Sequence, residues 1–126
     1  MKLEAIHTAN APAAIGPYSQ AQKVGNLLFC SGQIALDPKT MQMVGATAAE
    51  QAEQVMQNLT ALLKAGGAGL SQVARTTIYL ASMDDFAAVN EVYGRHFGAH
   101  KPARATVAVK TLPKNGLVEI DCIAAV

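Results

Sequence analysis

The stretch Thr47–Gly67, TAAEQAEQVMQNLTALLKAGG, carries the clearest structural pattern of the 126-residue chain. Thr47 and Glu50 have the spacing of a capping box, in which a hydroxyl and a carboxylate satisfy free backbone N–H groups of the first helical turn. Apolar side chains then recur at intervals of four and three residues, which places them on one face: Ala48, Ala52, Val55, Leu59 and Leu62. Gly66 and Gly67 end the pattern. The sequence therefore predicts an amphipathic helix between Thr47 and Gly66.

Strand-like segments precede this helix. Ser19–Val24 and Leu27–Ile34 are separated by Gly25-Asn26, a dipeptide that tolerates positive φ and is typical of a hairpin. A short third strand is expected at Gln42–Val44. The first part of the chain is thus predicted to form antiparallel strands.

A strand and a second helix are expected after the first helix. Val73–Leu80 is the strand, and Ser82 with Asp85 repeats the capping spacing after it. The helix that follows has an apolar face made of Phe86, Val89, Tyr93 and Phe97. Gly98 ends this second helical pattern.

Two more strands are predicted at the end of the chain, Ala103–Lys110 and Leu117–Val126, around the loop Thr111–Gly116. The order β-β-(β)-α-β-α-β-β has strands at both ends and helices in the middle. This order favours an α+β sandwich, with one mixed sheet and two helices on one face, as a single domain over residues 1–126. The apolar end Ile123–Val126 would fray unless the last strand were packed inside the sheet.

Composition limits the kinds of partner. Apolar residues make up 51% of the chain and charged residues only 15%, against about 25% in typical soluble domains. Either the fold is simply rich in Ala and neutral polar residues, or part of its surface is buried against other copies. The net charge of +1, without a run of Lys or Arg, lacks the electrostatic footprint of a nucleic-acid binder.

The sequence shows no targeting or membrane-spanning segment. Cys30 and Cys122 form neither a metal-spaced pair nor a disulfide framework. We therefore expect a reduced, cytoplasmic protein without a membrane partner.

Familiar catalytic motifs are missing. The Gly-rich segment Gly66–Gly69 follows a helix, whereas a phosphate cradle must precede one. His96 and His100 have the i, i+4 spacing of two metal ligands, but a glycine lies between them and no third ligand is near in sequence. Cys30 and Ser31 lack a His in a motif that would activate them. Neither a metal site nor a nucleophilic triad is expected.

Two charged residues remain as candidates for a site. Arg104 opens a strand beside a loop, and its planar fork suits a carboxylate, although a surface ion pair is the simpler alternative. Glu119 lies in an apolar strand on the same face as Asp121, which a solvated strand face would also explain. By themselves these residues suggest only a small anionic ligand.

Several motifs occur together in a characteristic order: APAAIGPYSQA at Ala11–Ala21, SGQI at Ser31–Ile34, PARATV at Pro102–Val107, LPK at Leu112–Lys114 and VEI at Val118–Ile120. In this order and spacing, over about residues 6 to 125, the chain resembles the RidA (YjgF) family. The resemblance implies a chorismate-mutase-like fold and a homotrimer with a site in each cleft between subunits.

The resemblance also implies an activity, that of a 2-iminobutanoate/2-iminopropanoate deaminase. Such an enzyme hydrolyses reactive 2-imino acids, formed from enamines that pyridoxal-phosphate dehydratases release, to 2-oxo acids and ammonia, without any cofactor of its own. One alternative is a non-catalytic trimeric module that binds small 2-oxo or other carboxylates. Another, associated with some family members, is translation inhibition or RNA cleavage, against which the charge balance argues.

The resemblance assigns roles to individual residues. Arg104 matches the Arg that holds the substrate carboxylate, and Glu119 matches the Glu that positions or deprotonates the attacking water. Tyr18 and Ser31 match residues that line the site. Gly32 matches a Gly whose small size lets the substrate approach the backbone. A retained Glu119 favours the enzyme over the binding module, because binding alone does not need an acid–base group.

Two further positions bear on this resemblance. Asn90 matches a recurrent Asn of the second helix, with a structural role near the site. Many family members carry a Cys two residues after the Arg, where this chain has Thr106. The departure puts thiol-based modification at this point in doubt, but not the hydrolysis.

Strand geometry restricts how Arg104 and Glu119 could share one ligand. If the last two strands formed a simple hairpin, Glu119 would lie about 13 Å from the partner of Arg104, at ~3.3 Å per residue. Therefore either these strands are not hairpin partners, or each site takes residues from a neighbouring subunit.

Overall fold

The computed structural model describes residues 1–126. In it, helix α1 (Ala48–Ala65) forms where the sequence predicts it. The Thr47 hydroxyl accepts a hydrogen bond from the Glu50 N–H at 3.2 Å, and the Glu50 carboxylate accepts one from the Thr47 N–H at 3.0 Å. Gly66 caps the other end. The predicted apolar face of α1 is buried, and α2 (Phe86–Phe97) likewise buries Val89, Tyr93 and Phe97. Neither helix is long and apolar enough to cross a membrane.

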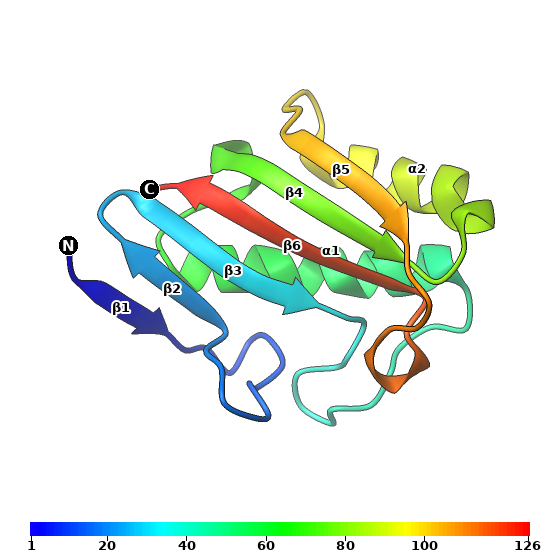
Figure 1. Ribbon diagram of the computed structural model, residues 1–126, viewed down its shortest axis with the longest axis horizontal. Coiled ribbons are helices and arrows are strands. Elements are labelled where there is room, and N and C mark those ends of the chain that lie inside the picture. Colours follow the sequence, from blue (N-terminus) through cyan, green and yellow to red (C-terminus); the bar gives the residue numbers. More distant parts are fainter.

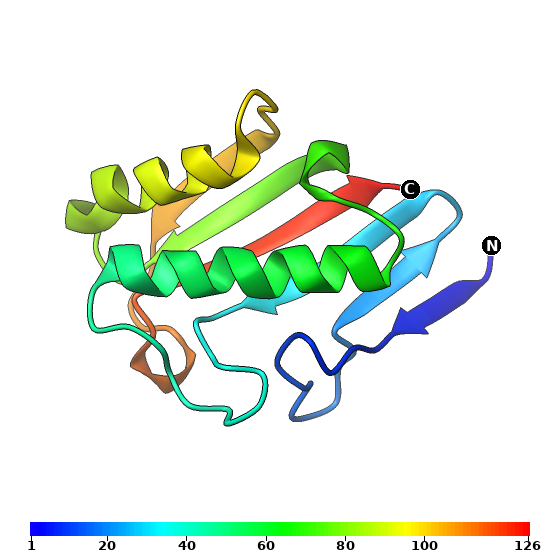
Figure 2. The same ribbon diagram turned by 180° about the vertical axis from the view of Figure 1, so that it is seen from behind.

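Six strands form one mixed sheet, with both helices on one face (Figures 1 and 2). The strands are β1 (Leu3–Ile6), β2 (Ala21–Val24), β3 (Leu27–Gln33), β4 (Val73–Leu80), β5 (Ala103–Ala108) and β6 (Val118–Ala125). Their spatial order is β1-β2-β3-β6-β4-β5, in which only β4 and β5 pair in parallel. The predicted α+β class and the β2–β3 hairpin are confirmed.

The C-terminal strand lies in the middle of the sheet, as its apolar sequence predicts. β6 pairs with β3 on one side and β4 on the other. Its alternate residues Ile120, Cys122 and Ala124 are buried beneath the helices, whereas Glu119 and Asp121 point to the other face and are only half-buried. The sheet therefore has a helix-covered face and an uncovered face; the uncovered face is turned toward the viewer in Figure 1.

Three local predictions were wrong or incomplete. Gln42–Val44 is not a strand, because only Met43 pairs, through an isolated bridge to Leu36. The edge strand β1 was missed, since three of its four residues are exposed and its sequence has no apolar run. Ser82 does not cap α2 directly: it accepts a hydrogen bond from the Asp84 N–H and caps a short 3₁₀ turn that precedes the helix.

The last two strands are not hairpin partners. β4 lies between β5 and β6, and its Thr76 pairs with Arg104 on one side and with Cys122 on the other. The loop that joins β5 to β6 crosses the end of β4 and contains a 3₁₀ turn at Pro113–Asn115. Of the two possibilities that strand geometry left open, the structure therefore bears out the first, that these strands are not hairpin partners.

Candidate active site

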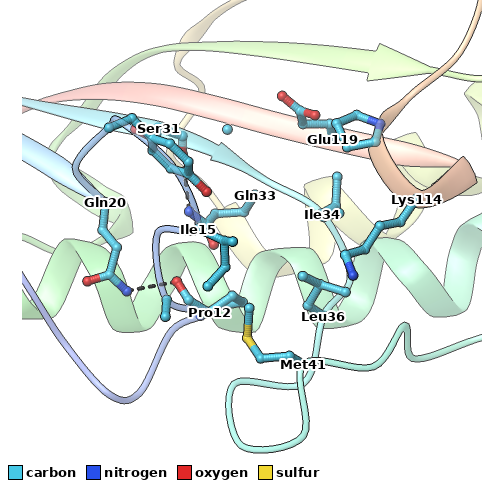
Figure 3. A pocket seen from close by; sticks show the side chains of 14 residues that line it. Pro12, Ile15, Gln20, Ser31, Gln33, Ile34, Leu36, Met41, Lys114 and Glu119 are labelled. Atoms are coloured by element: carbon cyan, nitrogen blue, oxygen red, sulfur yellow. Dashed lines mark hydrogen bonds between the residues drawn. The ribbon is translucent and has the colours of Figure 1, made fainter.

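A pocket of about 680 Å³ opens beside the ends of β3 and β6 (Figure 3). Its walls come from the loop between β1 and β2, from the end of β3 with the loop that follows, and from the loop that enters β6. The lining residues are Pro12, Ala13, Ile15, Tyr18, Gln20, Ser31, Gly32, Gln33, Ile34, Leu36, Met41, Pro113, Lys114 and Glu119. The pocket thus brings together Tyr18, Ser31, Gly32 and Glu119, four of the residues expected at the site.

Glu119 supplies the pocket's only carboxylate. It projects from β6 on one side of the pocket, across from the apolar side chains of Leu36 and Met41 (Figure 3). The carboxylate makes no hydrogen bond or ion pair within the chain. A half-buried carboxylate without a partner is available to exchange a proton with a bound water or ligand.

The surroundings of Glu119 favour its protonated form. Burial, and to a smaller extent the charge of Asp121, raises the pKa of Glu119 above the ordinary 4.5. Asp121 is two residues further along β6 on the same face and accepts a hydrogen bond from the Tyr79 hydroxyl at 3.0 Å. A raised pKa brings a carboxyl closer to the range in which it can both accept and release a proton near neutral pH.

Ser31 and Tyr18 present hydroxyl groups to the same pocket. The Ser31 hydroxyl donates to the carbonyl oxygen of Ser19 at 2.6 Å, so toward a ligand it can act only as an acceptor. Tyr18 is 54% exposed. A backbone hydrogen bond joins the two segments that carry these residues: the Ser31 N–H donates to the Gln20 carbonyl oxygen at 2.9 Å.

A buried amide, Gln20, holds the loop that carries Tyr18. Its Nε2 donates to the carbonyl oxygens of Thr8, Ala11 and Pro12, and its Oε1 accepts from the Thr8 N–H (Figure 3 shows the bond to Pro12). Because four hydrogen bonds converge on one side chain, this wall of the pocket is fixed before any ligand arrives.

Buried amides of α1 hold the other two walls. Asn58 Nδ2 donates to the carbonyl oxygens of Ile34 and Leu36, at 3.1 and 2.9 Å. Gln51 Oε1 accepts from the Leu117 N–H at 2.8 Å, just before β6. Sequence reasoning missed these residues, because the partners are backbone atoms far along the chain and only a structure reveals the pairing.

Lys114 is a further pocket residue that was not assigned a role. Its backbone, with φ of 55°, lies in the left-handed region, as does that of Asn115. The side chain lines the pocket, but the amino group points away from the Glu119 carboxylate (Figure 3). Lys114 is the only cation at the pocket. In the sequence, its motif LPK contributed only to the family resemblance.

Arg104 and Asn90, the other expected site residues, lie elsewhere. The Arg104 guanidinium donates to Asn90 Oδ1 at 2.6 Å and sits 5.0 Å from the ring centre of Tyr93. Both line a second hollow, together with His100 and Lys101. One of the five guanidinium N–H donors is therefore engaged by Asn90, and the others remain free for a ligand.

Within one chain, Arg104 and Glu119 cannot hold the same small ligand. Arg104 pairs with Thr76, which is buried under α2, whereas Glu119 pairs with Tyr79 on the uncovered face. Paired residues share a face, so the two side chains point to opposite sides of the sheet. Their positions are also two strands and three residues apart, about 14 Å at ~4.8 Å per strand and ~3.3 Å per residue.

The two histidines considered as metal ligands have structural partners. His96 Nε2 lies 2.9 Å from Glu53 Oε1, and His100 Nε2 lies 2.7 Å from the Val73 carbonyl oxygen. No group of three or more His, Cys, Asp or Glu side chains could hold a metal ion. Cys30 and Cys122 are buried cross-strand neighbours, free as thiols.

Known proteins resemble this chain over nearly its full length. A family model described as Endoribonuclease L-PSP matches residues 8–126. Protein DfrA of Myxococcus xanthus is 56% identical, over 98% of this chain and 96% of its own length. The 2-iminobutanoate/2-iminopropanoate deaminase of Mus musculus is 47% identical, over 94% of this chain and 88% of its own. The crystal structure of E. coli TdcF with bound serine superposes with a TM-score of 0.93 at 36% identity, covering 98% of each chain.

Proposed function

The chain belongs to the Endoribonuclease L-PSP (YjgF/RidA) family, and we propose that within it the protein is a hydrolytic deaminase of 2-imino acids. The unpartnered, half-buried Glu119 carboxylate carries this proposal, because it is an acid–base group directed into a pocket that also holds hydroxyls. The 47% identity to a protein named 2-iminobutanoate/2-iminopropanoate deaminase supports the same reaction.

The proposed chemistry needs only these side chains. The C=N carbon of a 2-imino acid is already electrophilic, so water can add without a covalent nucleophile. Glu119 accepts a proton from the water as its oxygen bonds to this carbon, which gives a carbinolamine. The imine reacts as its iminium form, so this addition leaves a neutral carbinolamine and a proton on Glu119. Glu119 returns that proton to the nitrogen and accepts the proton of the carbinolamine hydroxyl as the C–N bond breaks, so that ammonia and a 2-oxo acid leave. Positioned proton transfer of this kind contributes about 10²–10⁴ in rate.

The substrate carboxylate is held by Arg104 of a neighbouring copy in this proposal. Arg104 and Glu119 point to opposite faces of one sheet, so a complete site needs a second chain. The uncovered face exposes apolar side chains at Leu27, Phe29 and Val107, between 38% and 44%, which favours burial against other copies. A cyclic homotrimer, acting in the cytoplasm, would give three equivalent shared sites. The serine bound to E. coli TdcF supports a small ligand with a carboxylate.

A coupled assay tests the activity directly. A serine or threonine dehydratase generates the imine, semicarbazide traps it, and the rate of semicarbazone formation is compared with and without the protein. We expect the protein to suppress trapping and to accelerate release of the 2-oxo acid. Unchanged trapping would favour the non-catalytic binding module, and degradation of an RNA substrate by the same preparation would favour a nuclease.

The Glu119→Gln variant separates a catalytic from a structural role. It keeps the side-chain volume but removes the base, so turnover should fall by about 10²–10⁴. The raised pKa means that ionised Glu119 destabilises the fold above that pKa, so the Gln variant should melt no lower than the wild type at neutral pH. Affinity for unreactive 2-oxobutanoate should hold or improve. A variant that loses melting temperature together with activity would assign Glu119 a structural role instead.

A further inference from the structure

The strand that faces Glu119 contains an irregularity at Gly32. β3 and β6 pair in register at Cys30 with Cys122, and again at Gln33 with Ile120. Two residues of β3, Ser31 and Gly32, therefore stand opposite the single residue Asp121. This is a β-bulge, a device that bends a strand and redirects side chains beside a site.

The bulge brings the Gly32 Cα under the Glu119 side chain. A Cβ added to Gly32 would overlap Glu119 Oε2 and would lie 2.9 Å from Cδ and 3.1 Å from Cγ. These three nearest atoms all belong to the Glu119 side chain and none to the backbone. The Glu119 carboxylate thus occupies the space in which a side chain at position 32 would lie.

The backbone itself does not require glycine at this position. Gly32 is not among the residues with positive φ, in contrast to Gly25 at φ 58° in the β2–β3 turn. Gly32 is also exposed, so an added methyl group would not enter the core. An alanine should therefore be compatible with the fold and should disturb mainly the carboxylate above it.

We propose that Gly32 is a positioning residue that acts through Glu119: its bare Cα leaves the room that sets where the carboxylate stands. No hydrogen bond or ion pair within the chain holds this carboxylate, so its location depends on the space available. This role rests on the proposed function of Glu119 and differs from substrate approach to the Gly32 backbone, because in this structure the carboxylate fills that space.

Gly32→Ala tests this role, with Gly69→Ala as the matched control. An added Cβ at Gly69 meets nothing within 4 Å, and Gly69 has φ of −135°, so its replacement should change neither turnover nor folding. Gly32→Ala should lower kcat by about 10–100-fold, since misplacing a catalytic group by about 1 Å can cost that much. The KM and the affinity for 2-oxobutanoate should change less than threefold, and the melting temperature should stay within a few degrees of the wild type.

The decisive comparison places Gly32→Ala in the Glu119→Gln background. If Gly32 acts only through the Glu119 carboxylate, the double variant should turn over no more slowly than Glu119→Gln alone. The proposal would be overturned if the turnover losses of the two substitutions multiplied in the double variant, or if Gly32→Ala alone changed only KM. Either result would support substrate approach to Gly32. A wild type without turnover would instead refute the proposed deaminase.

The carboxyl pKa of Glu119, followed by ¹³C NMR, gives a readout that does not depend on turnover. Gly32→Ala should move this pKa down toward the ordinary Glu value, because the carboxylate is pushed out of its half-buried place, while Gly69→Ala should not move it. An unmoved pKa in Gly32→Ala would contradict the positioning role.

Discussion

The two faces of the sheet differ in what covers them and in what they contribute to the site. The helix-covered face is closed by α1 and α2 over a core that includes Leu59, Ile78 and Ile120, each at most 1% exposed. The uncovered face mixes exposed apolar side chains with the Tyr79–Asp121 hydrogen bond and the unpartnered Glu119. The first face stabilises the single chain, whereas the second is the surface that the proposed trimer would bury and holds the carboxylate that the proposed reaction uses.

The same difference between the two faces divides the expected site. Arg104 lies on the edge strand β5, packed against Tyr93 of α2 on the covered side. Glu119 lies on a central strand and points to the uncovered side. The alternation of side chains along β5 and β6 thus separates the proposed carboxylate-binding group from the proposed acid–base group within one copy. In the proposed function, a second copy would bring the two groups together.

The largest expected effect comes from Arg104. Arg104→Ala should lower kcat/KM by about 10²–10⁴, because two charge-assisted hydrogen bonds to the substrate carboxylate are lost. Arg104→Lys should restore little, since a point charge cannot reproduce the planar fork. Steady-state kinetics with analytical ultracentrifugation measures both activity and assembly. Near-wild-type activity in the Lys variant would exclude bidentate binding.

Two substitutions, one on each face of the sheet, separate the stability of the single chain from the assembly of its copies. Leu59→Ala removes a fully buried side chain of α1 and should cost about 2–5 kcal/mol in the free energy of unfolding. Phe29→Ser, on the uncovered face, should weaken assembly, so that sedimentation equilibrium at micromolar concentration shifts from trimer toward ~13 kDa monomer. A wild type that sediments as a monomer or a dimer would count against the trimer.

A smaller effect is expected at Asp121. Its charge helps to raise the pKa of Glu119, so Asp121→Asn should lower that pKa. Glu119 accepts a proton only when ionised, hence activity is present above its pKa and is lost as the pH falls through it. The acid limb of the pH–kcat/KM profile should therefore move to lower pH in the Asn variant. A limb that stays in place or moves upward would mean that another group controls it.

The sequence predicted elements better than it predicted neighbours. Capping spacing and apolar periodicity located α1, and the apolar end of β6 correctly implied a place inside the sheet. Alternation correctly placed Asp121 on the face of Glu119. The strand order could not be predicted from the sequence, because the insertion of β4 between β5 and β6 depends on long-range pairing. The left-handed backbone conformation of Lys114 and the hydrogen bonds of the Gln20 side chain depend on contacts that no local pattern encodes.

Mixing two inactive variants tests the shared site most directly. Arg104→Ala and Glu119→Gln chains, carrying different tags, are co-expressed, and the mixed assemblies are purified through both tags. If each site combines Arg104 of one copy with Glu119 of the next, random mixing should regenerate an intact pair at roughly a quarter of the sites in a cyclic trimer, and double-tag purification should raise this share. We therefore expect activity well above that of either variant alone. Mixed assemblies as inactive as their parents would contradict a site shared between copies.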